Sequence, residues 1–335
     1  MSESVPNDVV LSLRHVTIAY NGPPPVTVVR DVSLDVYSGE ILGLIGESGS
    51  GKSTLAYAIM RILKNGTMTS GAITVNGRNV YGMSAEELRR FRWREMAMVF
   101  QTAMNALNPV LTVGEQMVDT LQSHLSLGRR EARARALELL SLVRLDASVL
   151  DSYPHELSGG MRQRVVIAIA IALNPRLVIM DEPTTGLDVV VQRTILDEIV
   201  DIQRRHHYTI LFISHDFPLV SSIADRVAVM YAGQIVEISE GRAIQDVGHV
   251  HHPYTQGLIR AVPQLIGDEP TAIGIPGNPP DPRNLPVGCA YQDRCPLVQP
   301  ICRREGPQLT PVGDIVVACH VVQQEEANVH GLGSS

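Results

Sequence analysis

The fold is decided by one glycine-rich stretch, which reads Gly46-Glu47-Ser48-Gly49-Ser50-Gly51-Lys52-Ser53-Thr54. It matches the phosphate-loop pattern, in which Gly-x4-Gly-Lys is followed by Ser or Thr. Residues 40–45 before it predict a strand, and residues 53–60 after it predict a helix. In this order, the loop N–H groups and the helix N-terminus surround phosphate oxygens. The stretch therefore predicts a nucleoside triphosphate site in an α/β fold, the alternative being a chance glycine-rich turn.

Two side chains of this loop have chemistry suited to a triphosphate. We expect the Lys52 ammonium to contact the β- and γ-phosphates and the Ser53 hydroxyl to ligate Mg²⁺. The residues expected to bind the nucleotide here are Gly46, Ser48, Gly49, Ser50, Gly51, Lys52, Ser53 and Thr54.

Polar residues follow two short apolar runs further along the chain. Residues 177–180 end in Asp181 and Glu182. Residues 210–213 lead to His215. Such runs are typical of buried parallel strands, whose carboxyl ends carry functional groups. We expect Asp181 to hold Mg²⁺ through water and Glu182 to polarise the attacking water. His215 is expected to contact the γ-phosphate, with a structural role as the alternative.

Composition restricts the class of protein. The chain has 335 residues, more than one core usually organises, with 44% apolar and 19% charged residues. A net charge of −7 argues against a general nucleic-acid binder, which would carry a basic face. The longest apolar run, residues 165–173, is less than half of the ~20 residues that a membrane-spanning helix needs. Residues 1–10 do not resemble a secretory signal, so we expect a cytosolic protein.

Several other segments have a predictable local structure. Residues 9–13, 16–20 and 32–36 are rich in β-branched residues and predict strands. Residues 83–160 are expected to be mostly helical, with a helix start at residues 84–87 and an amphipathic helix over residues 131–143.

One further motif identifies a family. Residues 157–164 read Leu-Ser-Gly-Gly-Met-Arg-Gln-Arg and resemble the signature motif of ATP-binding-cassette (ABC) proteins. Gln101, Asp188 and His215 stand in the order in which that family has its other motifs. Tyr20 stands where the family has an adenine-stacking aromatic residue, although it also fits the end of a strand.

The resemblance covers residues of about 9 to 243 and implies a P-loop NTPase fold of the ABC type. That fold has a parallel-sheet core, an antiparallel β subdomain and a helical subdomain, expected over about residues 103–164 of a domain spanning residues 1–243. Two cassettes would meet head to tail, with ATP between one phosphate loop and the other chain's Ser158, Gly159 and Gly160. The resemblance also implies nucleotide contacts by Tyr20 and Asp188, and roles for Gln101 in catalysis and as a Mg²⁺ ligand.

A narrower resemblance comes from the loop at residues 101–109, from residues 184–189 and from the C-terminal part of the chain. There, residues 252–258, 276–282 and 289–320 resemble the extension of the dipeptide/oligopeptide and nickel importer ATPases. This predicts an extension over residues 244–335 and a peripheral ATPase at the cytoplasmic face of the membrane, energising peptide uptake.

The partners that this resemblance implies are a second ABC ATPase subunit, either a related chain or a copy, two transmembrane permease subunits and an extracellular solute-binding protein, with no nucleic acid. The alternatives are another cargo (nickel, an oligosaccharide or an opine) and a soluble ABC ATPase without a transport role.

All four cysteines of the chain lie in its C-terminal part, and their spacing is Cys-x5-Cys-x6-Cys-x16-Cys. In a reducing cytosol this clustering favours metal ligation over disulfides. The close cysteine pair usual in structural zinc sites is missing, whereas four thiolates fit a [4Fe–4S] cluster, which some members of the resembling family are thought to carry. The expected ligands are Cys289, Cys295, Cys302 and Cys319. Zinc and unligated core cysteines remain the alternatives.

The histidines before this region are not expected to bind metal. We expect His249 and His251 to be solvated, and the resemblance places His252-Pro253 in a structural turn. Residues 329–335 are expected to form a disordered tail.

Overall fold

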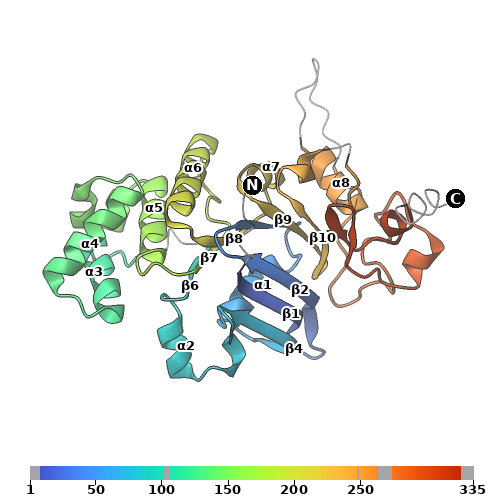
Figure 1. Ribbon diagram of the computed structural model, residues 1–335, viewed down its shortest axis with the longest axis horizontal. Coiled ribbons are helices and arrows are strands. Elements are labelled where there is room, and N and C mark those ends of the chain that lie inside the picture. Colours follow the sequence, from blue (N-terminus) through green and yellow to red (C-terminus); the bar gives the residue numbers. More distant parts are fainter. Residues whose placement is uncertain (1–7, 102–105, 247–248, 263–273, 326–335) are drawn as a thin grey trace, which may run out of the picture. The chain divides into compact units, whose positions relative to one another are not determined.

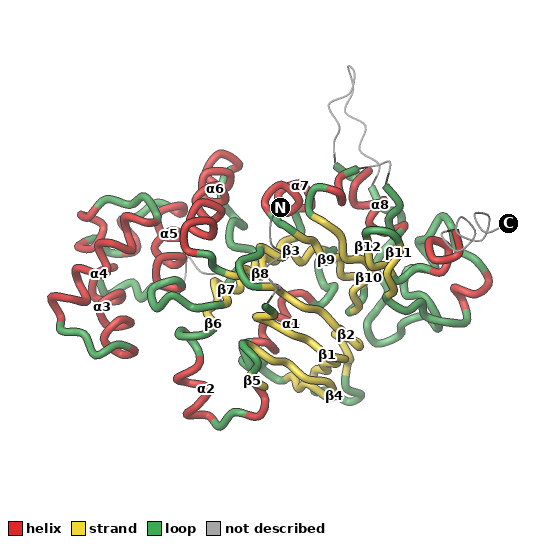
Figure 2. The backbone as a smooth tube through the Cα atoms, viewed as in Figure 1, coloured by secondary structure: helices red, strands yellow, loops and turns green. Residues whose placement is uncertain are grey.

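Strand β3 (Ile41–Ile45) leads into the glycine-rich loop, and helix α1 (Lys52–Ile59) follows it (α1 is labelled in Figure 1, and β3 in Figure 2). All five strand residues are buried, and β3 pairs in parallel with β9 (Arg226–Tyr231). The predicted order of strand, loop and helix is therefore confirmed.

The computed structural model describes residues 8–101, 106–246, 249–262 and 274–325. The chain divides into two compact units, each made of several segments. The first contains Met1–Ser12, Asp35–Glu40 and Thr74–Leu211. The second contains Leu13–Leu34, Ile41–Ile73 and Phe212–Ser335. The predicted tail at residues 329–335 lies outside the described residues.

The second unit contains the phosphate loop and the C-terminal part of the chain. Its strands β10 (Gln234–Glu240), β11 (Thr310–Val312) and β12 (Ile315–Val317) give the order β11-β12-β10-β9-β3. The pairs of β10 with β9 and β12, and of β11 with β12, are antiparallel. The C-terminal segment therefore adds two strands to the sheet that carries the phosphate loop. The sequence did not predict these strands, because three residues are too few to show a periodicity.

Three long strands precede or follow β3 along the chain: β1 (Val9–Tyr20), β2 (Val26–Tyr37) and β4 (Gly66–Val75). Strand β1 lies between β2 and β4. The two strands predicted over residues 9–20 are a single strand, in which His15 has a left-handed backbone with φ of 51°.

The first unit is mainly helical, as expected. Its helices are α2 (Ala85–Phe91), α3 (Val113–His124), α4 (Arg129–Leu142), α5 (Gly159–Ala170) and α6 (Val189–His206). The predicted start of α2 is confirmed, because Ser84 and Glu87 form a capping box. Strand β6 (Met96–Val99) pairs in parallel with β7 (Leu177–Asp181), and β4 pairs antiparallel with β5 (Arg78–Asn79). Strand β8 (Thr209–Ser214) begins in this unit and ends in the second one.

The C-terminal region contains more regular structure than the sequence predicts. Helix α8 (Pro253–Arg260) begins there after His252, while helix α7 (Phe217–Ile223) lies in the preceding part of the chain, before β9. Residues 274–299, by contrast, form no helix or strand, as expected of a proline-rich segment (Figure 2). No helix among the described residues is long and apolar enough to cross a bilayer.

His251 and His252 are both buried, so the prediction that His251 would be solvated is wrong, whereas His252 was expected in a structural turn and starts helix α8. The Nδ1 atom of His251 lies 2.7 Å from a carboxylate oxygen of Glu237, whose other oxygen accepts a bond from the amide of His252. Glu237 lies on β10 and is fully buried, as are both histidines to within about 2%. His252 Nδ1 accepts a hydrogen bond from the amide of Tyr254 and caps α8. These side chains attach the start of α8 to the sheet, which a local sequence pattern does not reveal.

The two histidines respond to pH in opposite ways. Burial lowers the pKa of His252 to about 4. Burial alone also lowers the pKa of His251, but the hydrogen bond and charge of Glu237 outweigh it and raise that pKa. Stability from the His251–Glu237 pair is therefore present below pH 6.5 and is lost as pH rises through the raised pKa. Below pH 6.5 the unfolded chain protonates His252 while the folded chain does not, so acid destabilises the fold through His252.

We predict that His252→Asn makes stability less sensitive to acid, because asparagine also accepts the capping hydrogen bond but does not titrate. Between about pH 7 and about pH 5, the wild type should lose roughly 2 kcal/mol more of its free energy of unfolding than the variant does. Urea unfolding at the two pH values measures this difference. The exposed His155, changed to Asn, is the control, and equal pH dependence in wild type and His252→Asn would contradict the assignment.

Candidate functional site

The phosphate loop is folded around its lysine. Lys52 Nζ donates hydrogen bonds to the carbonyl oxygens of Gly46 (2.7 Å) and Glu47 (2.9 Å) and to the hydroxyl of Ser50 (3.3 Å). The Lys52 residue is buried. Its ammonium is therefore held inside the curve of the loop, where the oxygens of a triphosphate would meet it.

Glycine is required at two positions of this loop because other backbone lies against it. A Cβ on Gly46 would lie 2.1 Å from the carbonyl oxygen of Met230 on β9. Gly51 caps α1 with a left-handed backbone, φ 106°, and a Cβ there would lie 3.0 Å from the carbonyl oxygen of Val28. At Gly49, nothing lies within 4 Å of an added Cβ. The loop is thus held closely against β9 and β2 at its two ends and is open in its middle.

Tyr20 lies beside the same loop. Its hydroxyl is 3.2 Å from the hydroxyl of Thr54, in the first turn of α1. The structure thus brings together Tyr20 and the predicted loop residues in the second unit. His215 belongs to that unit as well and is exposed just after the end of β8.

The two acids at the end of β7 lie in the first unit. Asp181 is the last residue of the strand and is fully buried. Glu182 follows with a left-handed backbone, φ 51°, which is a strained conformation for a non-glycine residue. Its carboxylate accepts a hydrogen bond of 2.7 Å from the Thr185 hydroxyl. Such strain is common at functional positions, and the Thr185 contact orients the carboxylate.

The signature motif forms the start of α5, also in the first unit. Ser158 caps this helix by accepting a hydrogen bond from the amide of Met161 (3.3 Å). A Cβ on Gly160 would lie 2.7 Å from a methyl group of Val191 at the start of α6, so glycine permits the close approach of the two helices. Ser158 is exposed, so an anion could approach the positive N-terminal end of the helix dipole there.

The remaining predicted residues of the first unit have clear local positions. Asp188 is exposed and caps α6, since its carboxylate accepts a hydrogen bond from the amide of Val191 (3.0 Å). Gln101 is exposed directly after β6, while residues 102–105 of the loop predicted there lie outside the described residues. The predicted site residues are thus divided between the two units.

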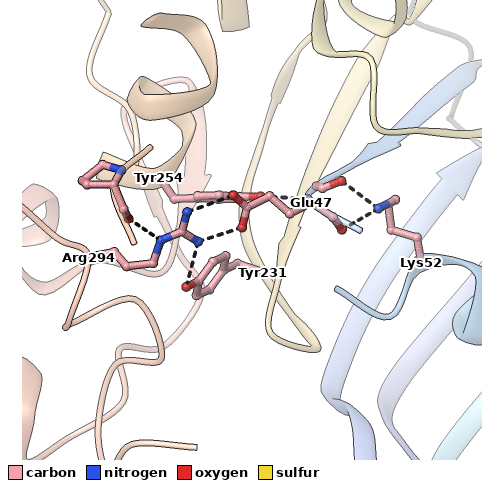
Figure 3. Close-up of polar contacts among 7 residues, drawn as sticks. Glu47, Lys52, Tyr231, Tyr254 and Arg294 are labelled. Carbon is pink, nitrogen blue, oxygen red and sulfur yellow. Dashed lines mark hydrogen bonds and ion pairs between the residues drawn. The ribbon is translucent and has the colours of Figure 1, made fainter. Parts of the chain in front are cut away.

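Sequence reasoning missed a set of residues that hold the loop from the C-terminal region. Glu47 pairs with Arg294 through two hydrogen bonds, and the amide of Glu47 donates to the hydroxyl of Tyr254 (Figure 3). The sequence contains no local signal for this contact, because 247 positions separate Glu47 from Arg294.

The four cysteines come together in the second unit. All are free thiols and they line one cavity of about 10 Å³, which is about the space of one water. The amide of Cys289 donates a hydrogen bond of 2.8 Å to the carbonyl oxygen of Cys302. Burial raises the pKa of the Cys289 thiol to about 11 and raises those of Cys295 and Cys319. These three thiols are therefore protonated at neutral pH.

The donor chemistry of this cavity fits a metal or cluster, but the present arrangement does not. Among the described residues, no group of three or more His, Cys, Asp or Glu side chains is placed to hold a metal ion. A cavity of about 10 Å³ also leaves no space for a cluster between the thiols. The cysteines thus converge on one point without forming a ligand set.

Known proteins resemble this chain along most of its length. The family described as "ABC transporter" matches residues 29–185, and "Oligopeptide/dipeptide transporter, C-terminal region" matches residues 236–302. Oligopeptide transport ATP-binding protein OppD of Escherichia coli (strain K12) is 40% identical over 311 residues, covering 91% of each chain. Probable D,D-dipeptide transport ATP-binding protein DdpD of the same organism is 42% identical over 327 residues, covering 96% of this chain and 99% of the relative.

Solved structures agree with these relatives. The ATP-binding cassette MJ0796, in a dimeric post-hydrolysis state bound to ADP and Pi, has a TM-score of 0.63 at 29% identity. The match covers 69% of this chain and 99% of that one, so the predicted cassette fold is confirmed. The chain therefore belongs to the oligopeptide and dipeptide transport family of ABC proteins, and it is an ATPase.

Proposed function

We propose that this chain is the ATP-hydrolysing subunit of an importer that takes up peptides across the cytoplasmic membrane. The observation that carries the proposal is the phosphate loop closed around Lys52, in a chain whose C-terminal region matches that of oligopeptide and dipeptide transporters. The relatives named above, which align with more than nine-tenths of this chain, are described as an oligopeptide transport and a probable D,D-dipeptide transport ATP-binding protein.

In this proposal, the nucleotide is bound mainly by residues of the second unit. The backbone amides of the loop and the ammonium of Lys52 bind the phosphates, and Tyr20 stacks on the adenine. Ser53, Gln101 and Asp181 are the residues that would hold Mg²⁺, which would neutralise charge on the phosphates. The buried position of Lys52 and its bonds to loop carbonyls support this assignment, because the loop is preformed.

Hydrolysis is assigned to residues that follow β7 and β8. Glu182 polarises the attacking water as general base, and His215 contacts the γ-phosphate. The hydrogen bond from Thr185 and the left-handed backbone at Glu182 support a carboxylate held in one orientation. Transfer of the γ-phosphoryl group to water then depends on positioning and on neutralisation of its charge.

A second cassette completes the site. The start of α5, where Ser158 is exposed and Gly159 and Gly160 are half-buried, is suited to bind the γ-phosphate of ATP held by another cassette. The dimeric state of the MJ0796 cassette supports such a pairing. Two permease subunits and a solute-binding protein are the further partners proposed, and they place the chain at the cytoplasmic face of the membrane.

We predict that Glu182→Gln abolishes hydrolysis while ATP still binds, because the amide keeps the shape of the side chain but cannot accept a proton. The ATPase rate constant should fall by roughly 10²–10⁴, the usual contribution of a positioned base. Phosphate release under saturating ATP measures it, with the exposed Glu138 changed to Gln as control. A rate within about tenfold of the wild type would exclude Glu182 as the base.

Thr185→Val tests the orientation of that base. Loss of its hydrogen bond to Glu182 should lower kcat about 5- to 30-fold, the equivalent of roughly 1–2 kcal/mol, without a comparable change in KM for ATP. The control is Thr194→Val. The Thr194 hydroxyl donates a hydrogen bond to the carbonyl oxygen of Val190 in its own helix α6, a contact away from Glu182. An unchanged kcat, or a KM that rises as much as kcat falls, contradicts the assigned role.

We also propose that the four cysteines bind a cofactor, which is a [4Fe–4S] cluster or, as the alternative, zinc. Four thiols lining one cavity support it, whereas their present arrangement would have to open. Protein purified without oxygen should be brown, with a broad visible absorbance that bleaches on reduction. Metal analysis separates the cases: zinc in place of iron selects the alternative, and absence of both metals shows that the cysteines are unligated core residues.

A further inference from the structure

We propose that Arg294 and Tyr254, from the C-terminal region, are positioning residues for nucleotide binding, because they fix Glu47 and through it the phosphate loop. The inference rests on the binding of ATP by this loop and is independent of what the importer carries. It gives the C-terminal region a role in the ATP site itself.

The first contact is a nearly buried ion pair. Arg294 Nη1 and Nη2 donate hydrogen bonds of 2.7 and 2.9 Å to the two carboxylate oxygens of Glu47. The side chain of Arg294 is 5% exposed and that of Glu47 is 27% exposed. Two parallel bonds from a planar guanidinium fix the direction of the carboxylate as well as its distance. The pair thus specifies one position for Glu47.

Arg294 is itself held rigidly. Its Nε donates a hydrogen bond of 2.8 Å to the carbonyl oxygen of Pro276, and its Nη1 lies 3.3 Å from the hydroxyl of Tyr231. The guanidinium carbon also lies 5.8 and 5.9 Å from the ring centres of Tyr231 and Tyr291. A guanidinium held by hydrogen bonds and by two aromatic rings has few accessible positions, so it also restricts the position of the Glu47 carboxylate bonded to it.

The second contact acts on the backbone of Glu47. Its amide donates a hydrogen bond of 2.9 Å to the hydroxyl of Tyr254, which is fully buried against the ring of Tyr231. Burial raises the pKa of Tyr254, so its hydroxyl stays neutral. On the other side of the same residue, the carbonyl oxygen of Glu47 accepts the hydrogen bond from Lys52 Nζ. Figure 3 shows the resulting line of contacts from Arg294 through Glu47 to Lys52.

The proline-rich segment of the C-terminal region also lies beside the loop. Pro279, Pro280, Pro282 and Leu285 line a small cavity together with the loop residues from Glu47 to Ser50. The carbonyl oxygen of Pro282 accepts a hydrogen bond of 3.0 Å from Arg30 on β2. The proline-rich segment therefore lies next to the loop and is attached to β2 by this hydrogen bond.

The physical consequence is preorganisation. A loop already held in its binding conformation loses less conformational freedom when the phosphates arrive, so nucleotide affinity is higher. Arg294 also neutralises a carboxylate that would otherwise stand unpaired close to a polyanionic ligand. Both effects predict that breaking the pair weakens binding, while neither requires a change in the chemistry of hydrolysis.

The test is a double-mutant cycle on the full chain, read as the equilibrium Kd for ATP and ADP with Mg²⁺. Arg294→Gln should raise both Kd values about tenfold, and Arg294→Lys should raise them less, because it keeps the charge but loses the second bond. Glu47→Gln together with Arg294→Gln should be no weaker than Arg294→Gln alone, since both changes break one pair. In the hydrolysis assay, KM should rise while kcat stays within about twofold.

Matched variants separate this effect from damage to the fold. Arg303→Gln removes an exposed ion pair with Asp293 in the same region and should leave the Kd values unchanged. Circular dichroism checks folding, and Tyr254→Phe, which removes only the acceptor for the Glu47 amide, provides a second route if Arg294→Gln does not fold. Folded Arg294→Gln or Tyr254→Phe with wild-type Kd values, or an equal increase in Arg303→Gln, overturns the proposal. Absence of peptide transport by the wild-type chain, together with Kd values that rise in Arg294→Gln as predicted, would instead contradict only the proposed function.

Discussion

The structure of the ATP site depends on one constraint: a buried ammonium must be held at the centre of a loop whose own carbonyl oxygens are its partners. Lys52 meets this constraint by bonding to Gly46 and Glu47. The loop then has to curve tightly, and it does so where β9 lies so close that only glycine fits at position 46. The parallel pairing of β3 with β9 brings the two so close together, so the conformation of the loop depends on the arrangement of the sheet.

The C-terminal region extends the same constraint. It adds β12 to β10, buries His251 against Glu237 and brings Arg294 to the carboxylate of Glu47. The region is therefore part of the unit that contains the phosphate loop, and one of its four cysteines, Cys295, directly follows the arginine that holds the loop. We therefore expect a change in the fold around Cys295 to alter the position of Arg294 and, through it, the affinity for the nucleotide.

The features predictable from the sequence are those encoded over short distances. The phosphate loop, the signature helix and the acids after β7 each follow from residue types at fixed spacing, and the elements found agree with them. The strands β11 and β12, the burial of His251 and His252 and the Glu47–Arg294 pair depend on residues far apart in the chain. Contacts between distant residues produce no periodic pattern in the sequence. The burial of His251, for example, cannot be predicted unless its buried partner Glu237 is known. The cysteine spacing likewise predicts convergence, which is found, but not the arrangement of the thiols.

The central claim is that ATP bound at this loop energises peptide uptake. The most direct measurement is the accumulation of a labelled peptide in vesicles that contain this chain with its permease subunits and solute-binding protein. We expect accumulation with hydrolysable ATP on the side of this chain, and none with a non-hydrolysable analogue. Equal accumulation with both nucleotides, or steady hydrolysis without movement of any peptide, would contradict the account.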